Sequence, residues 1–372
     1  MSRLSDPCRL GRKEIKNRLV RAATSERLAG SEGECTDELV AFLERLARHE
    51  VGTIITGHAF PEPAGRGNSH QLGVDRDERI PGLARLAAAL HRYDAHVVLQ
   101  VGHCGLFGHR SINGQGPGGP SVPSWIDTRT TRVRVYDETD IALAIQSFGA
   151  AARRALEAGM DGVQLRAGQG YLVHQFLSPR TNHRTDSWGG ALAGRARFLV
   201  GCVREMVDKT YGEMPVWVQI NVDDGVEDGV TFEEAVACAR LVREAGGSVV
   251  ELAAGTVERP ETILRTVGAP ESEAWSAWKV RPFREIEDLV LLATGGVRSP
   301  EIIDVLLQGK RLDLVGMARP FIREPDLALR LFRGLTPRCI SVGRCARERS
   351  GLLRCRADAP PGGLEGIAGP ID

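Results

Sequence analysis

The chain has 372 residues, 42% of them hydrophobic, and its 48 Lys and Arg residues balance 48 Asp and Glu residues. This balance leaves no net field that would attract nucleic acid or an anionic membrane surface. No apolar run approaches the ~18 residues needed to span a bilayer, and the opening stretch MSRLSDPCRLGRKEIKNR lacks a secretory signal. We expect a protein that acts on a small molecule and binds neither nucleic acid nor membrane.

Eight cysteines are scattered through the chain rather than clustered as a disulfide framework. This usage favours a reducing, cytoplasmic location. Barrel enzymes of the kind inferred below often form dimers or larger assemblies, so a homo-oligomer stays open, although no segment specifies an interface.

Short apolar runs rich in β-branched residues recur along the chain, and most are followed by a stretch with helical periodicity. The predicted strands are Arg18–Ala23, Thr53–Gly57, His96–Val101, Gly162–Arg166, Pro215–Ile220, Val249–Ala253, Leu289–Thr294 and Leu312–Met317. The predicted helices are Thr36–His49, Pro81–Tyr93, Glu138–Ala158, Ala193–Thr210, Phe232–Ala245 and Pro300–Gln308. Eight strands alternating with helices favour a single-domain TIM (β/α)₈ barrel, with a doubly wound open sheet as the competitor.

Cap signals support several of these helices. Asp137 or Thr139 can cap the third helix and Gly159 can end it, while Thr231 with Glu234 forms a capping-box pattern. The sixth helix is weak, because Thr256–Glu287 shows mixed periodicity. We place the barrel in residues 1–335 and a C-terminal extension, containing cysteines and then rich in Gly and Pro, in residues 336–372.

Two connections are long for a barrel. His103–Tyr136 follows the third strand, and Thr256–Glu287, with Trp275 and Trp278, follows the sixth. Both leave the carboxyl ends of strands, so they either shape a substrate pocket or run as surface loops.

The ends of strands seven and eight, ATGGVRSP and VGMARP, combine small residues with an Arg and a helix start. Freed backbone amides and a helix N-terminus favour a phosphate there, and two tight turns with surface arginines are the alternative. Gln100, Gln219, Thr24 and the backbone near Gly57 could bind the edge of a flat heterocycle. These residues alone indicate only some phosphorylated ligand.

The stretches EIKNRLVRAATSE, GTIITG, VVLQVGHCG, ATGGVRSPEII and LVGMARPFIREPDL, together with the FLSPRTN…GG…R run from Phe176 to Arg195, follow a known pattern in order. From about Leu10 to Leu335 the chain resembles the old yellow enzyme family, in its branch of NADH:flavin oxidoreductases and dienoyl-CoA reductase-like proteins. The resemblance implies a TIM barrel that binds FMN and takes electrons from NADPH or NADH.

The resemblance also implies roles for particular residues. Ala22, Ala23 and Thr24 would line the flavin, with Thr24 near O4 and N5, while Gly57 and His58 would approach it through the backbone. Gln100 would meet the pyrimidine edge, and the phosphate would be held by Gly295, Gly296, Ala318 and Arg319.

Two catalytic positions depart from the family pattern. Where the family has a His and, three residues later, a His or Asn that bind a substrate carbonyl oxygen, this chain has Arg166 and Gln169. Tyr171, the family's proton donor, is present. Where the family has an Arg or Lys near flavin N1 and O2, this chain has Gln219, which should disfavour negative charge on the reduced flavin by about 1–3 kcal/mol.

Three hypotheses for Arg166 remain open at this point. Its guanidinium could supply the charge that Gln219 lacks, bind a substrate carboxylate, or turn away and pair with a nearby Asp or Glu. In the extension, Cys339, Cys345 and Cys355 resemble three of the four cysteines that hold an iron–sulfur cluster in the dienoyl-CoA reductase branch. The fourth position is Val342, so we expect no metal.

The sequence therefore predicts an FMN-dependent oxidoreductase that uses NADPH or NADH to reduce an activated C=C bond in a small conjugated substrate. Arg166 and Gln169 would hold the activating oxygen and Tyr171 would protonate the α-carbon. A flavin-dependent dehydrogenation or redox-neutral rearrangement in a biosynthetic pathway is one alternative, and a flavin-binding protein that has lost catalysis is another.

Overall fold

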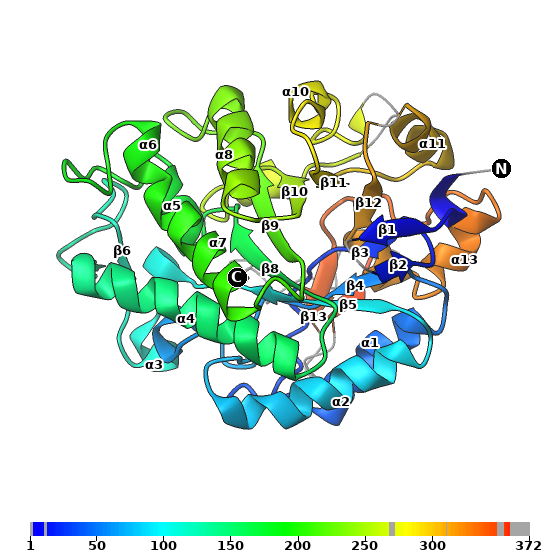
Figure 1. The fold of residues 1–372 in the computed structure, drawn as a ribbon, viewed down its shortest axis with the longest axis horizontal. Helices are drawn as coiled ribbons and strands as arrows, with labels where there is room; N and C mark the ends of the chain where they lie inside the picture. Colours follow the sequence, from blue (N-terminus) through cyan, green and yellow to red (C-terminus); the bar gives the residue numbers. More distant parts are fainter. Residues whose placement is uncertain (1–2, 11–12, 268–271, 310, 348–352, 358–372) are drawn as a thin grey trace.

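The computed structural model describes residues 3–10, 13–267, 272–309, 311–347 and 353–357. Within them, eight parallel strands close into a barrel (Figure 1), which confirms the predicted TIM barrel and excludes the open sheet. In barrel order these strands are β3 (Leu19–Arg21), β4 (Thr53–Ile55), β5 (His96–Val101), β8 (Gly162–Ala167), β9 (Val216–Asn221), β10 (Val249–Ala253), β11 (Val290–Thr294) and β12 (Leu314–Met317). Every predicted strand corresponds to one of them.

The longer helices pack around the strands (Figure 1). They are α1 (Asp37–Ala47), α2 (Ile80–His91), α4 (Glu138–Glu157), α7 (Arg197–Lys209), α8 (Phe232–Glu244) and α11 (Pro300–Gln308). Asp137, not Thr139, is the N-cap of α4, and the capping box of Thr231 and Glu234 begins α8. The helix predicted from residue 193 is divided, because a separate turn, α6 (Leu192–Arg195), precedes α7.

In place of a regular sixth helix, the described residues after β10 form the single-turn helices α9 (Pro260–Ile263) and α10 (Arg281–Arg284). The chain after β12 forms α12 (Arg319–Arg323) and α13 (Leu327–Phe332). The remaining short elements are η1 (Arg3–Ser5), β1 (Cys8–Leu10), β2 (Lys13–Ile15), η2 (Pro63–Gly65), η3 (Asp77–Arg79), η4 (Gly105–Phe107), α3 (Arg110–Asn113), β6 (Gly118–Gly119), β7 (Arg134–Val135), α5 (Leu172–Leu177), β13 (Cys345–Arg347) and β14 (Leu353–Cys355). The Gly/Pro-rich end of the extension lies outside the described residues.

The barrel interior has an apolar floor. The antiparallel hairpin β1–β2 contributes Cys8, Leu10 and Ile15. These side chains form one cluster with inward-facing strand residues, namely Val20, Ile55, Val98, Trp217, Val249, Leu292 and Leu314. Since side chains alternate along a strand, the residues two positions further on also face inward. These include Gln100, Gln219, Glu251 and Thr294, so a polar layer lies above the apolar floor.

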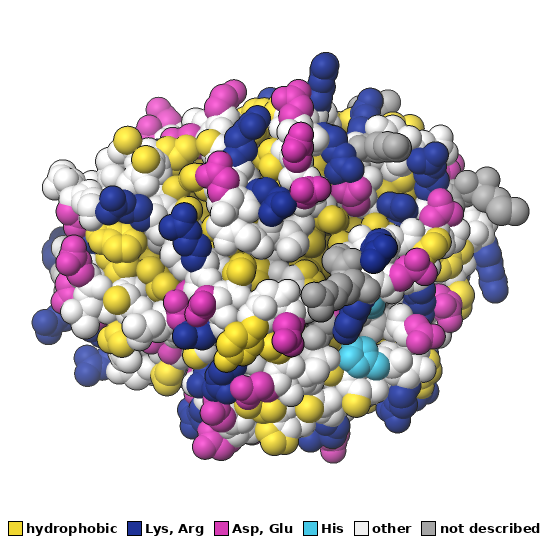
Figure 2. All heavy atoms as spheres, in the orientation of Figure 1, with side chains coloured by type: hydrophobic (Ala, Val, Ile, Leu, Met, Phe, Trp, Pro, Cys, Tyr) yellow, Lys and Arg dark blue, Asp and Glu magenta, His cyan; other side chains and the backbone are white. Residues whose placement is uncertain are grey.

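Positive and negative side chains are interspersed on the face of the molecule in Figure 2, in keeping with the balanced composition. Among the described residues, none of the helices has the length and apolarity that a membrane crossing requires.

Candidate active site

A cavity of about 180 Å³ opens at the carboxyl ends of the strands. It contains many of the residues that the sequence singled out. Its lining residues are Ala23, Gln169, Gln219, Glu251, Ala253, Ala254, Ile263, Leu264, Trp275, Thr294, Gly295, Gly296, Val297, Gly316, Met317, Ala318, Arg319, Pro320 and Ser341. A polar floor, a rim of small residues and an Arg at one side fit a flat ligand that has a polar edge and an anionic group.

The glycine pair after β11 is shaped by a close neighbour. Gly295 and Gly296 have φ angles of 138° and 71°, and a Cβ on Gly296 would lie 2.1 Å from the Trp275 ring. Both the positive φ and this contact require glycine. Trp275 comes from the long segment after β10, so that segment does border the cavity.

Arg319 connects the cavity to the C-terminal extension. Its guanidinium donates to the carbonyl oxygens of Ser341, at 2.9 Å, and Arg265, at 3.1 Å. Ser341 itself lines the cavity. The sequence did not indicate this contribution of the extension, since no motif in that segment signals a contact with strand eight.

A buried ion pair fixes the segments after β3 and β4. Arg21 pairs with Glu26 at 2.8 Å, and Glu26 accepts the Gly57 N–H at 3.0 and 3.1 Å. A Cβ on Gly57 would lie 2.0 Å from the Glu26 carboxylate, so glycine is required. This pair holds the turns that carry Ala22, Ala23, Thr24 and His58. No motif in the sequence indicated either of its members.

Arg166, His58, Gln169 and Tyr171 form a second group beside the cavity. Arg166 Nη1 lies 3.0 Å from His58 Nδ1, and Nη2 donates to Gln169 Oε1 at 2.9 Å. The guanidinium lies 3.7 Å from the centre of the Tyr171 ring, and the His58 ring meets the same ring edge-on at 5.0 Å. In the described chain no carboxylate lies within ion-pair distance of Arg166, so the predicted alternative of an Asp or Glu partner is not what the structure contains.

The protonation of His58 follows from its neighbours. Since a guanidinium only donates, His58 Nδ1 must accept, which places the ring proton on Nε2. Burial, and then the charges of Arg166 and Arg27, hold the pKa of His58 well below 6.5. Burial also lowers the pKa of Arg166, opposed by Tyr171 and Glu251. The group therefore combines a neutral imidazole with a guanidinium that stays charged.

Gln169 is held in an unusual backbone conformation. Its φ is 59°, in the left-handed region that non-glycine residues seldom adopt. Its N–H donates to Asn221 Oδ1 at 3.0 Å, and its carbonyl accepts from Val257 N at 3.1 Å. These bonds from β9 and from the segment after β10 fix the turn that directs the Gln169 side chain to Arg166.

Two buried members of the polar layer were not predicted. Gln164 and Glu251 lie inside apolar runs on β8 and β10 rather than at the strand ends, and both are fully buried. Burial raises the pKa of Glu251, opposed by hydrogen bonds that include Gln219 and Gln164. The usable signal was a polar residue at an inward position of the period-two strand pattern.

The long segment after β5 borders a small hollow next to the Arg166 group. Phe107 and Trp125 stack there at 5.9 Å. His174, which also lines this hollow, is bonded to Asp224 at 2.8 Å. Both long connections thus contribute aromatic side chains near the strand ends.

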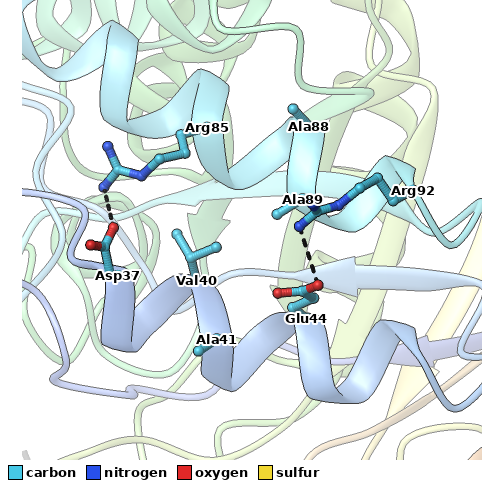
Figure 3. Close-up of a pocket in the computed structure, with 8 residues that line it drawn as sticks. All are labelled: Asp37, Val40, Ala41, Glu44, Arg85, Ala88, Ala89 and Arg92. Carbon is cyan, nitrogen blue, oxygen red and sulfur yellow. Dashed lines mark hydrogen bonds and ion pairs between the residues drawn. The ribbon is translucent and has the colours of Figure 1, made fainter.

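A wider groove lies elsewhere, between α1 and α2 (Figure 3). It is crossed by the ion pairs Arg85–Asp37 and Arg92–Glu44, each at 3.2 Å. It has no group of the kind found at the strand ends, so we assign no chemistry to it.

All eight cysteines lie in the described part of the chain as free thiols. Cys345 and Cys355 are direct partners across β13 and β14. Burial, with Cys339 and Cys355 adding to it, raises the pKa of Cys345 to about 11. Within the described residues no group of three metal-ligating side chains is arranged to hold an ion.

Comparisons with known proteins identify the family of this chain. The profile of the NADH:flavin oxidoreductase / NADH oxidase family matches residues 3–337. An NADH oxidase of Thermoanaerobacter brockii is 30% identical over 98% of this chain and 56% of its own length, and an NADPH dehydrogenase of Bacillus velezensis is 31% identical over 75% and 79%. A solved complex of 2-naphthoyl-CoA reductase with 2-naphthoyl-CoA superposes with a TM-score of 0.83 at 27% identity, over 90% of this chain and 52% of the other.

The chain thus spans about half the length of the first curated relatives it matches. The family match implies FMN as the cofactor and NADH or NADPH as the electron donor. The predicted family relationship is confirmed by the profile match, and an old yellow enzyme homologue from Zymomonas mobilis shares the fold, with a TM-score of 0.78 at 23% identity over 94% of this chain and 98% of the other. Eight parallel strands and a cavity lined by Gly295, Gly296 and Arg319 at their carboxyl ends fit that assignment, and the chain belongs to the NADH:flavin oxidoreductase / NADH oxidase family.

Proposed function

We propose that this protein is an FMN-dependent oxidoreductase that uses NADH or NADPH to reduce an activated C=C bond in a small conjugated substrate. The observation that carries the proposal is the position of Arg166, Gln169 and Tyr171 beside the cavity at the strand ends. Gln169 belongs to both the cavity and this group, so a substrate there would lie next to a ligand in the cavity.

In this proposal the cofactor contacts are those implied by the family pattern. Ala22, Ala23 and Thr24 line the flavin, Gly57 and His58 approach it, and Gln100 and Gln219 face its pyrimidine edge. Gly295, Gly296, Ala318 and Arg319 hold the phosphate. The placement of Ala23, Gln219, Gly295, Gly296, Ala318 and Arg319 around one cavity supports it.

FMN, when bound, supplies hydride transfer between the nicotinamide and the substrate. Arg166 and Gln169 bind and polarise the oxygen that activates the substrate double bond. Tyr171 then donates a proton to the α-carbon. Its hydroxyl makes no hydrogen bond to a described residue, so the proton is available for transfer.

We propose that Arg166 serves the substrate rather than the flavin edge. Its hydrogen bonds go to two neutral acceptors, His58 and Gln169, so its charge is not neutralised by a partner there. A carboxylate or an acyl carbonyl oxygen is the ligand that an uncompensated guanidinium recognises best.

The visible spectrum of the purified protein, before and after anaerobic addition of NADH or NADPH, tests the function. Bleaching of a bound flavin by either donor is the expected result. A protein that binds no flavin would overturn the proposal. A flavin that stays oxidised with both donors would favour the second candidate, a substrate-driven oxidation or a redox-neutral rearrangement. The departure of Arg166 and Gln219 from the family pattern motivates this candidate.

Tyr171→Phe tests the proton donor. We expect the nicotinamide to bleach the flavin as in the unchanged protein, while reoxidation by an enone or enoate slows by about 10²–10⁴-fold. Tyr211→Phe, at a tyrosine with 75% of its surface exposed, is the control. Equal reoxidation rates in all three proteins would remove Tyr171 from the mechanism, and no reoxidation by any substrate would favour a flavin-binding protein without catalysis.

We further propose a barrel of residues 1–335 followed by an extension of residues 336–372. Ser341 of this extension lines the cavity and accepts from Arg319, which supports a role for this part of the extension in closing one side of the cavity. A reducing, cytoplasmic setting is supported by the free thiols of all eight cysteines.

A further inference from the structure

Four side chains of the polar layer form one continuous hydrogen-bonded row across the barrel. Gln100 Nε2 donates to Gln164 Oε1 at 2.8 Å, and Gln164 Nε2 donates to Glu251 Oε2 at 2.7 Å. From the other side, Gln219 Nε2 donates to Glu251 Oε1 at 3.1 Å. All four residues are buried, with exposed fractions of 0 to 6%.

The carboxylate of Glu251 determines which way each amide points. Both oxygens of Glu251 accept amide N–H groups, Oε2 from Gln164 and Oε1 from Gln219. Burial raises the pKa of Glu251, but these two hydrogen bonds and the charge of Arg166 favour its ionised form. The ionised carboxylate only accepts, so both NH₂ groups must turn towards it. Gln164 then presents its oxygen to Gln100, which fixes the Gln100 amide as well. One acidic residue thus sets the orientation of three amides on β5, β8 and β9.

This orientation leaves two acceptors without a partner. Gln219 Oε1 and Gln100 Oε1 are buried and make no hydrogen bond with the described residues. Gln219 lines the cavity. A buried polar atom without a partner costs about 1–3 kcal/mol, so the Gln219 oxygen indicates a ligand that offers it an N–H.

Charged groups around the row do not change this polarity. Neighbouring strands bring Arg166, Gln219 and Glu251 to one level of the barrel. The guanidinium of Arg166, however, bonds to His58 and Gln169 instead of Gln219. The other neighbour in the cavity lining, Thr294 on β11, is neutral. In the described chain, therefore, no cation stands beside the Gln219 oxygen in this part of the cavity.

We propose that Glu251 is a positioning residue that turns the Gln219 oxygen towards the flavin edge, so that the reduced flavin carries a proton at N1. The inference rests on the proposed binding of FMN with its pyrimidine edge at Gln219. In the balanced reaction, hydride brings two electrons and a proton to N5, NAD(P)H becomes NAD(P)⁺, and a second proton from solvent binds N1. The N1–H donates to Gln219 Oε1, a bond that a cation at this position would prevent.

The test is the midpoint potential of the full-length holoenzyme measured against pH by spectroelectrochemistry, which needs no nicotinamide. Each proton taken up with two electrons lowers the potential by about 30 mV per pH unit. We expect a slope of about 60 mV per pH unit across the neutral range, corresponding to two protons. A slope of about 30 mV per pH unit would overturn the proposal.

Glu251→Gln tests the positioning role. The carboxamide introduced at position 251 accepts from one neighbouring amide and donates to the other, so one neighbour must rotate its amide group. Rotation at Gln219 changes that amide alone, whereas rotation at Gln164 also forces the Gln100 amide to rotate. We expect Gln219 to present its N–H and the slope to fall to about 30 mV per pH unit. Glu251→Asp, which keeps a carboxylate, should restore the steeper slope.

Glu62→Gln is the matched control, because Glu62 is a partly buried carboxylate that pairs with His103 outside the cavity. It should leave the slope unchanged. If Glu251→Gln does not fold, Gln219→Lys gives the same information, since the new cation can pair with Glu251 and should also reduce the slope to about 30 mV per pH unit. An unchanged slope in the variant that folds would sink the inference, whereas absence of bound flavin in the unchanged protein would instead sink the proposed function.

Discussion

At the residue scale, His58 combines deep burial with a charged neighbour. Its Nδ1 accepts from Arg166, and its ring meets Tyr171 edge-on. Protonation of the ring would break the bond to Arg166 and place two positive charges together. The folded protein therefore keeps His58 neutral where an unfolded chain would protonate it.

This arrangement predicts a loss of stability in mild acid. Because the pKa of His58 lies well below 6.5 in the folded state, only the unfolded state binds this proton as the pH falls. His58→Gln keeps an acceptor for Arg166 and removes the titration. Between about pH 6.5 and 5.5 the unfolding free energy of the variant should fall by about 1 kcal/mol less than that of the parent.

Urea unfolding of the flavin-free protein at both pH values measures this difference. His109→Gln, at an exposed position, should retain the parental pH dependence. If the His58 variant loses as much stability as the parent, the ring is not the neutral acceptor described above.

Residues at strand ends could be predicted, whereas residues that act from within strands could not. Arg166 lies near the end of β8, and Gln169 and Tyr171 follow shortly after it, so their proximity was fixed by local geometry. The proposed role of Glu251 depends on its hydrogen bonds with Gln164 and Gln219, which lie on other strands. A single chain without pairing information does not reveal such contacts across strands.

At the scale of elements, local chemistry determined the regular helices. The Asp137 side chain accepts the Asp140 N–H at 2.8 Å, and Asp140 returns a bond to the Asp137 backbone. Such boxes depend on neighbouring residues alone, so the sequence predicted the start of α4. The segment after β10 could not be predicted in this way, because Trp275 is placed by contact with Gly295 and Gly296 instead of by helical periodicity.

Removing the cap of α4 should therefore weaken the fold measurably. Asp137→Ala leaves N–H groups of the first turn without their acceptor, and we expect a loss of about 1 kcal/mol in the unfolding free energy. Asp137→Asn keeps a capping oxygen and should lose much less. Equal losses for the two variants, measured by urea denaturation, would show that charge and not capping matters there.

At the scale of the whole molecule, the barrel and its extension meet at Arg319. Arg319 is the first residue of α12, and its guanidinium donates to the carbonyl oxygens of Ser341 in the extension and Arg265 in the segment after β10. Three parts of the chain that lie far apart in sequence therefore converge on the side of the cavity where we propose the phosphate.

Deleting residues 336–372 should weaken FMN binding, because it removes the Ser341 acceptor and part of the cavity wall. Loss of one hydrogen bond to a charged group, about 1.5 kcal/mol, corresponds to roughly a tenfold increase in Kd. Fluorescence titration of the flavin-free protein measures it. Deleting only 358–372 is the control, and equal Kd values for the two deletions would contradict a role for Ser341.

The apolar floor formed by the β1–β2 hairpin limits the access of small molecules to the barrel interior to one end. With Cys8, Leu10 and Ile15 sealing one end, the barrel is a cup rather than a tube. Whatever reaches the row of amides above that seal must arrive and depart through the same opening. An electron donor and an electron acceptor that both need the flavin would therefore have to bind one after the other through that opening.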